Sequence, residues 1–177
     1  MEIRLHYIEQ GEGFPLILLH GNGEDHTYFK RQMEPFADHF RVIAVDTRGH
    51  GESPRGTGPF TLSQFAEDLK SFFDQHGISK CHLLGFSDGG NVALLFALKY
   101  PDRVERLILN GANLDPCGVK LKTQIPIVLG WGLCRLCALF SQQAKQNWEM
   151  LNLMVTQPHI HRAELAGLDM PVLVVAG

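Results

Sequence analysis

The chain has 177 residues, of which 45% are hydrophobic and 20% are charged, and its formal net charge is −3. This composition is typical of one globular domain with a sizeable core, and without a basic excess it gives no support to nucleic-acid binding. The first residues do not show the apolar run of a signal peptide, and four scattered cysteines do not make a disulfide scaffold. We therefore expect a cytoplasmic protein in a reducing compartment.

The most apolar stretch, residues 125–140, contains Arg135, two glycines and a proline. It is shorter than the roughly 20 apolar residues that span a bilayer. We therefore expect a buried or pocket-lining segment and no membrane partner. Cys134-x-x-Cys137 lies in this stretch without a second pair of ligands, so it predicts buried free thiols rather than a zinc or redox site.

Strand and helix signals alternate over the first 110 residues, which predicts an α/β fold with a mostly parallel sheet and flanking helices. Apolar runs predict strands at residues 3–9, 15–20, 41–46, 81–86 and 106–110. Helical spacing and capping residues predict helices at residues 28–40, from an N-cap at Thr61 to a C-cap at Gly77, and from just after Ser87 to Tyr100.

The alternation then stops. Residues 111–167 show no clear strand and one amphipathic helix near 144–155, and a strand returns at 171–176. We therefore predict an α/β core formed by residues 1–111 and 168–177. Residues 112–167 are predicted to be a helical cap inserted over the sheet.

The motif with the clearest chemistry is Gly85-Phe86-Ser87-Asp88-Gly89, a G-x-S-x-G sequence between a predicted strand and a predicted helix. A serine on such a sharp turn stands exposed at the edge of the sheet, and small residues on either side let the strand and the helix approach each other. The motif predicts that Ser87 is a nucleophile for acyl transfer to water.

A serine nucleophile also needs backbone N–H groups that face the developing oxyanion. The amide of Asp88 lies at a helix N-terminus and predicts one donor. The loop His20-Gly21-Asn22-Gly23 follows the first buried strand, and its glycines let the backbone approach a ligand closely. We therefore predict the amide of Asn22 as the second donor.

These segments together resemble the α/β-hydrolase superfamily. Matching segments are His20–Gly23, Asp46–Ser53, Gly85–Gly90, Tyr100–Val104 and Pro171–Gly177, in the order of the family. The version around Ser87 is similar to small carboxylesterases of the valacyclovir-hydrolase type. The overall pattern also resembles lactonases and carbon–carbon hydrolases, so the resemblance implies a hydrolase without choosing the substrate.

The family resemblance implies a catalytic acid after the strand that here ends at Gly177 and a histidine after one further strand. The sequence stops before both, so we expect a C-terminally truncated piece of a longer hydrolase with an uncovered sheet edge. Some family members place the acid after the preceding strand, which makes Asp115 a candidate acid.

Four histidines are alternatives for the missing base. His159 and His161 lie in the predicted cap and could reach over Ser87, although histidines beside a short helix are more often surface residues. His20 and His50 lie in loops near the predicted site. We expect these two to hold loop backbones by hydrogen bonds rather than to shuttle protons.

The side chain of Asp88 has two interpretations. An acidic residue in a first helical turn complements the helix dipole, an effect of about 0.3–1 kcal/mol. Alternatively, its carboxylate faces the pocket and attracts a cationic group of the substrate.

The sequence thus predicts a serine hydrolase that acts on a carboxylic ester or related acyl bond of a small-molecule substrate. No metal or organic cofactor is implied, and the uncovered sheet edge predicts self-association. One alternative is a binding module that uses a truncated hydrolase scaffold without turnover. Another is a fragment that regains activity by pairing with a complementary chain.

Overall fold

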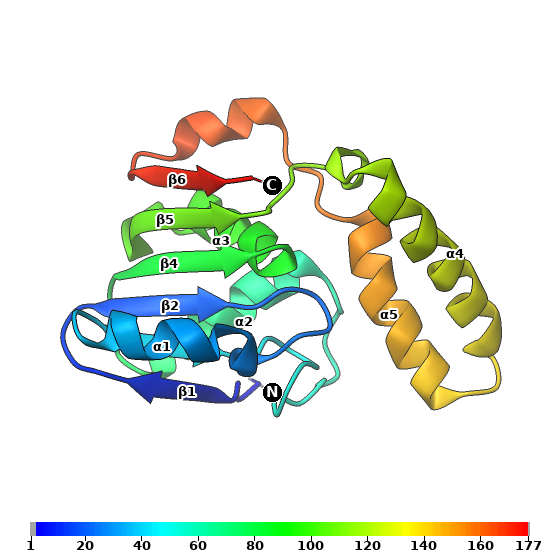
Figure 1. Cartoon of the computed structure of the whole chain (residues 1–177), viewed down its shortest axis with the longest axis horizontal. Helices are drawn as coiled ribbons and strands as arrows, with labels where there is room; N and C mark the ends of the chain where they lie inside the picture. Colours follow the sequence, from blue (N-terminus) through cyan, green and yellow to red (C-terminus); the bar gives the residue numbers. More distant parts are fainter. Residues whose placement is uncertain (1–2, 177) are drawn as a thin grey trace. The chain divides into compact units, whose positions relative to one another are not determined.

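Six strands form one sheet in the computed structural model, which describes residues 3–176 (Figure 1). The strands are β1 (Tyr7–Gln10), β2 (Pro15–Leu19), β3 (Arg41–Val45), β4 (Cys81–Phe86), β5 (Val104–Asn110) and β6 (Val172–Val175). Their order across the sheet is β1-β3-β2-β4-β5-β6. Only β1 and β3 pair antiparallel, and the other neighbours are parallel. The predicted α/β class with a mostly parallel sheet is confirmed.

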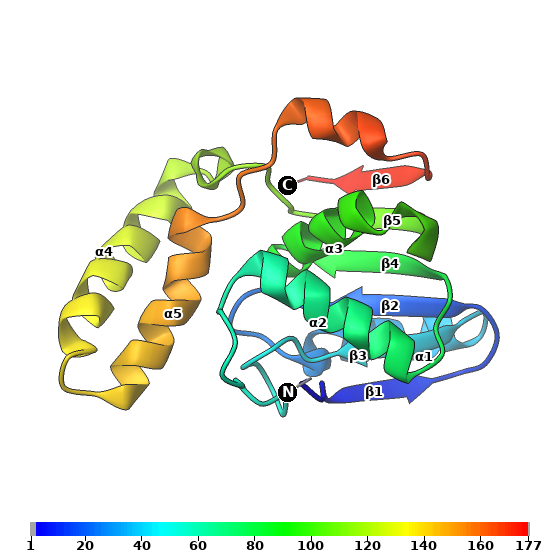
Figure 2. The ribbon, with the colours of Figure 1, turned by 180° about the vertical axis from the view of Figure 1, so that it is seen from behind.

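Helices cover both faces of this sheet. The helix α1 (Lys30–Ala37) lies on one face, whereas α2 (Leu62–Gln75) and α3 (Asp88–Lys99) lie on the other (Figures 1 and 2). The Thr61 side chain accepts a hydrogen bond from the N–H of Gln64 and so forms the predicted N-cap of α2. Short 3-10 helices occur at η1 (His26–Phe29), η2 (Pro101–Arg103) and η4 (Arg162–Gly167).

The central strands are buried because both of their faces are covered. One cluster lies on the face of α1 and comprises Leu16, Leu18, Phe29, Met33, Val42 and Ala44. Because successive strand residues point to opposite faces, Ile17 and Ile43 face α2 and α3, and both are fully buried. Each such side chain contributes about 1.5–3 kcal/mol relative to exposure, so the sheet rigidly supports the loops at its ends.

A buried ion pair fixes the loop after β3 to α2. The Nε of Arg48 lies 2.6 Å from Asp68 Oδ2, and its Nη2 lies 2.6 Å from Asp68 Oδ1. Both side chains are almost completely buried. The two parallel hydrogen bonds give the pair a fixed geometry, so the loop cannot move freely away from the sheet.

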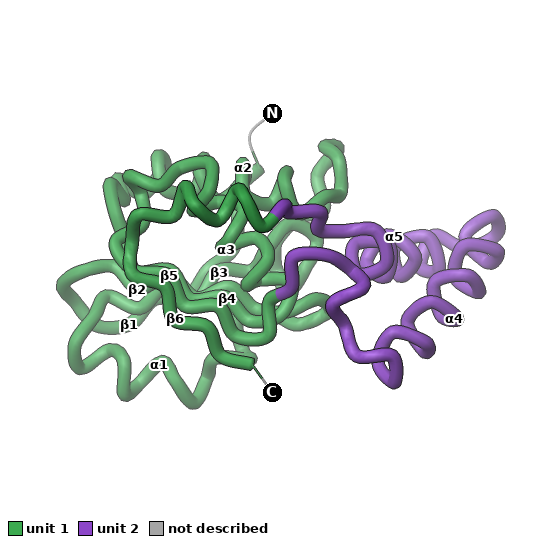
Figure 3. The backbone as a smooth tube through the Cα atoms, turned by 90° about the horizontal axis from the view of Figure 1, so that it is seen from above, with its two compact units in different colours: residues 1–112, 162–177 green, residues 113–161 purple. Residues whose placement is uncertain are grey.

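The chain divides into two compact units, coloured separately in Figure 3. One contains the sheet and runs up to Ala112 and from Arg162 onward, and the other comprises residues 113–161. The second unit contains η3 (Pro116–Gly118), α4 (Leu121–Cys137) and α5 (Gln142–Thr156). The predicted insertion was longer, because η4 belongs to the unit of the sheet. A covering role for the helical unit stays a prediction.

The side chains of α4 are more exposed than the sequence suggested. None is buried, and Leu129 and Leu133 are 70% and 64% exposed. Of the two expectations for residues 125–140, burial is therefore wrong, whereas a pocket-lining role stays a prediction. Cys137 is a free but exposed thiol, which also contradicts the prediction of a buried pair. Among the residues described, no helix is both long enough and apolar enough to cross a membrane.

Candidate active site

Ser87 occupies the turn between β4 and α3 in an unusual backbone conformation. Its φ is 51° and its ψ is −120°, and it is the only non-glycine residue with positive φ between residues 3 and 176. Its N–H donates to the carbonyl of Asn110 at 2.8 Å, and its own carbonyl accepts from the N–H of Asn91 at 3.0 Å. Such a conformation costs of order 1–3 kcal/mol, so the surrounding structure must impose it.

Glycines allow the close packing around this turn. A Cβ on Gly85 would overlap the backbone of Gly89 and Gly90. A Cβ on Gly89 would overlap the carbonyl oxygens of Leu19 and His20. The start of α3 is therefore pressed against the end of β2, which brings the loop after β2 beside the serine.

The loop after β2 meets the serine turn at two points. A Cβ atom added to Gly21 would lie only 3.2 Å from the Cβ of Ser87, so the two backbones are close together. The side-chain amide of Asn22 donates to Asp88 Oδ2 at 2.8 Å. Asp88 is the first residue of α3, so its N–H has no carbonyl partner within the helix. The structure thus brings Ser87, Asn22 and Asp88 together.

The carboxylate of Asp88 is buried and accepts two hydrogen bonds from side chains. Besides Asn22, it accepts a hydrogen bond from the side chain of Asn91 at 3.2 Å. Burial raises the pKa of Asp88, although these two hydrogen bonds act in the opposite direction. The side chain therefore tethers the loop after β2 to α3. Sequence reasoning missed this role, because Asn22 and Asp88 are far apart in the chain and no spacing links them.

His20 and His50 are buried in the loops beside the site. Nε2 of His20 accepts from the N–H of Thr47 at 3.1 Å, so its Nδ1 carries the proton and donates to the carbonyl of Gly21 at 2.7 Å. Nδ1 of His50 lies 3.1 Å from the carbonyl of Arg48. Burial lowers the pKa of His50 to about 4. Both histidines thus contact loop backbones.

Asp115 belongs to the helical unit and pairs with a histidine of the same unit. Its carboxylate accepts from the N–H of Cys117 at 2.9 Å and lies 2.8 Å from Nδ1 of His159. These hydrogen bonds lower the pKa of Asp115. The acid role of Asp115 stays a prediction.

One group of side chains between residues 3 and 176 could hold a metal ion. It comprises His6, His26 and Asp46, and none of the three is a predicted site residue. Asp46 opens a motif shared with the family, but the sequence gives no sign that two histidines contact it, because they lie 20 and 40 positions away.

Comparisons with known proteins give the family of this chain. A family model for the alpha/beta hydrolase fold matches residues 15–133. The 2-hydroxy-6-oxononadienedioate/2-hydroxy-6-oxononatrienedioate hydrolase of Escherichia coli is 36% identical over 155 residues, which cover 84% of this chain and 52% of that protein. Epoxide hydrolase 4 of Mus musculus is 40% identical over 111 residues, 60% of this chain and 31% of that protein.

Solved structures show the same likeness. A hydrolase from Pseudomonas aeruginosa PA01 matches with a TM-score of 0.74 and 26% identity, covering 99% of this chain and 76% of that chain. The chain spans about half the length of the bacterial relative above. All three of these proteins are hydrolases by name, but the names point to different substrates.

Proposed function

Because this chain belongs to the α/β-hydrolase family, we propose that it is a hydrolase whose nucleophile is Ser87. The observation that carries the proposal is the left-handed backbone of Ser87 at the first turn of α3, with the loop of Gly21 and Asn22 against it. A strained serine at a helix N-terminus is the arrangement that exposes a hydroxyl to a substrate carbonyl.

The proposed reaction is hydrolysis of a carboxylic ester or a related acyl bond. Ser87 Oγ attacks the carbonyl carbon while a general base takes its proton, and the carbonyl oxygen becomes an oxyanion. The backbone N–H groups of Asn22 and Asp88 are proposed to hold that oxyanion. Loss of one such donor typically costs about 10²–10³ in turnover. The base then protonates the leaving group, and water releases the acyl group from Ser87.

The general base is not identified among residues 3–176. His20 and His50 contact loop backbones, and both have lowered pKa values through burial. The one hydrogen bond between Asp115 and His159 is of the kind by which an acid orients a histidine. That likeness keeps Asp115 as the candidate acid, and Asp115→Asn is the variant that tests it.

Ester hydrolysis by the protein at its natural length tests the proposal. With short-chain p-nitrophenyl esters, we expect Ser87→Ala to lower kcat by at least about 10³. Ser63→Ala is the matched control, because Ser63 is an exposed serine on α2. Retention of most activity in Ser87→Ala would contradict the nucleophile. Substrate binding without turnover in the parent protein would favour a non-catalytic binding module instead.

We also propose a cytoplasmic location. The four cysteines are all free thiols in the structure, as expected in a reducing compartment.

A further inference from the structure

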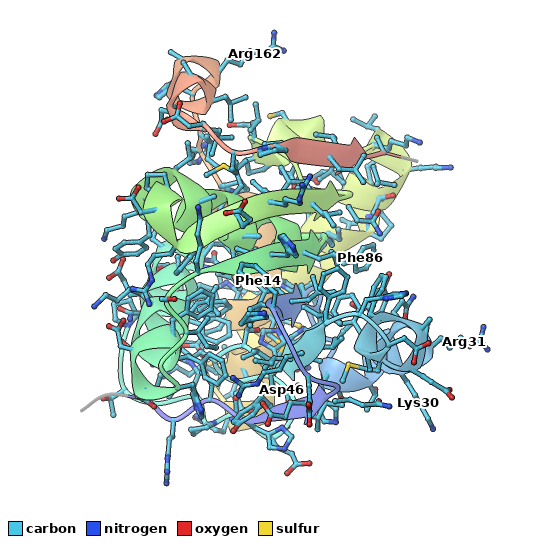
Figure 4. All side chains as sticks on the ribbon, turned by 90° about the vertical axis from the view of Figure 1, so that its left-hand side faces the viewer. Phe14, Lys30, Arg31, Asp46, Phe86 and Arg162 are labelled. Atoms are coloured by element: carbon cyan, nitrogen blue, oxygen red, sulfur yellow. The ribbon has the colours of Figure 1, made fainter. Side chains whose placement is uncertain are left out.

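Three side chains that can bind transition metals meet where β1 and β3 lie side by side. His6 precedes β1 and Asp46 follows β3, and the N–H of Asp46 donates to the carbonyl of His6 at 2.9 Å. His26 opens η1, and its N–H donates to Asp46 Oδ1 at 2.6 Å. Asp46 is labelled in Figure 4, which views the sheet from the opposite end of the parallel strands. The backbone therefore holds all three residues in place.

The ligand atoms of these residues converge. Nδ1 of His6 lies 2.8 Å from Asp46 Oδ2, and Nδ1 of His26 lies 3.0 Å from both carboxylate oxygens. One nitrogen or oxygen atom from each residue lies within 4.8 Å of the other two. Two ligand atoms held about 2.1 Å from one ion at the tetrahedral angle are about 3.4 Å apart. The atoms that are now hydrogen-bonded at 2.8 and 3.0 Å would therefore move apart by roughly half an ångström around one zinc ion.

Burial and charge also suit a cation. The side chain of Asp46 is fully buried, whereas those of His6 and His26 are 29% and 15% exposed. The backbone N–H groups of His26 and Glu52 donate to the two carboxylate oxygens of Asp46 at 2.6 and 3.0 Å. These bonds hold the carboxylate in place, and the partly exposed imidazoles leave a path from solvent.

A second carboxylate, that of Glu52, lies near the other ring nitrogen of His6. Oε2 of Glu52 lies 3.6 Å from Nε2 of His6, and the Glu52 side chain is exposed. A histidine that binds a metal through Nδ1 carries its proton on Nε2, and metal-bound histidines commonly donate that proton to a carboxylate. At 3.6 Å the two atoms form an ion-pair contact rather than a hydrogen bond, and a small shift of the exposed Glu52 side chain would make it such an outer partner.

We propose that His6, His26 and Asp46 form a zinc site. Two imidazole nitrogens and one carboxylate oxygen are a known zinc ligand set, which leaves one coordination position for water. The ion would join the segment before β1, the loop that carries Asn22 and the end of β3. Since the ion binds only the folded arrangement, zinc stabilises the protein. This site is separate from Ser87 and does not depend on the proposed hydrolase activity.

Zinc titration by calorimetry tests this site. The full chain should carry Cys117→Ser, Cys134→Ser and Cys137→Ser, so that thiols do not compete for the ion. We expect one bound Zn²⁺, a higher melting temperature with zinc, and affinity at least about tenfold weaker in both His6→Gln and His26→Gln. Cobalt(II) bound in place of zinc should give visible absorption bands.

His39→Gln is the matched control, because His39 is an exposed histidine outside the cluster. It should bind zinc like the parent chain. Glu52→Gln changes only an exposed side chain and should weaken zinc binding about tenfold with an unchanged circular dichroism spectrum, which keeps the test valid if a histidine variant fails to fold. Absence of saturable zinc binding would overturn the proposal, and the three side chains would then only stabilise the fold by their hydrogen bonds. Equal loss of affinity in His39→Gln, or full affinity in the histidine variants, would overturn it as well.

Discussion

At Ser87, the side chain proposed for chemistry lies on the only non-glycine backbone with positive φ between residues 3 and 176. The strain belongs to the turn and not to the hydroxyl, because the N–H of Ser87 is held by Asn110 and its carbonyl by Asn91. A glycine adopts this left-handed conformation without the steric cost that any side chain incurs. Serine at this position therefore makes the fold less stable than glycine would.

Two substitutions at Ser87 should therefore differ in stability. Ser87→Gly should raise the free energy of unfolding by about 1 kcal/mol relative to Ser87→Ala, because glycine relieves the strain while alanine keeps it. Urea denaturation of both variants measures the difference. Equal stability of the two variants would mean that the turn is not strained.

The lowered pKa of His50 predicts how the free energy of unfolding depends on pH. Burial lowers its pKa from 6.5 to about 4, so between these values the unfolded chain binds a proton that the folded chain does not. This contribution to stability is fully present above pH 6.5 and is lost as the pH falls toward about 4, at about 1.4 kcal/mol per pH unit. Chemical denaturation at pH 7 and pH 5 should show this loss in the parent chain.

The matched variants separate His50 from other titrating groups. His50→Gln should lose less stability between pH 7 and pH 5 than the parent chain, whatever its stability at pH 7. His39→Gln should lose as much as the parent, because His39 is exposed. An unchanged pH dependence in His50→Gln would show that the buried histidine does not control acid sensitivity.

At the scale of elements, β6 is the strand with the most exposed side chains. Its valines and leucine are all exposed, and Val174 reaches 66%. β6 is also an edge strand that pairs only with β5, so its other side presents backbone groups able to pair with another chain. These features support the proposal of self-association through this edge.

We therefore expect the 177-residue chain to self-associate as its concentration rises, as measured by light scattering. Val174→Lys should shift the chain toward the monomer, because a charge on the edge opposes pairing. Leu129→Lys on α4 places the same charge on an exposed apolar residue elsewhere and should not. A monomer at all concentrations, or an equal shift in both variants, would contradict this role of β6.

At the scale of the whole molecule, the sequence predicted what local patterns control. Apolar runs bounded by glycine or proline placed the strands, and G-x-S-x-G placed the turn of Ser87. The predicted edge strand at 3–9 began too early, because pairing with β3 starts only at Tyr7. The boundary of the helical insertion also differed, because the 3-10 helix after residue 161 groups with the sheet.

Contacts between distant residues could not be predicted in this way. Asn22 meets Asp88, and His6 meets Asp46, only because the strand order brings their loops together. A single sequence carries no periodicity or spacing for such pairs. The tether of the proposed oxyanion loop and the proposed zinc site therefore became visible only in the folded chain.

The central claim is that Ser87 is the nucleophile. Its most direct test is mass spectrometry of the protein at its natural length after reaction with a fluorophosphonate probe, which reacts covalently with activated serines. We expect one adduct on the peptide that contains Ser87, absent in Ser87→Ala and retained in Ser63→Ala. An adduct on another residue, or hydrolysis that continues with Ser87 unmodified, would contradict it.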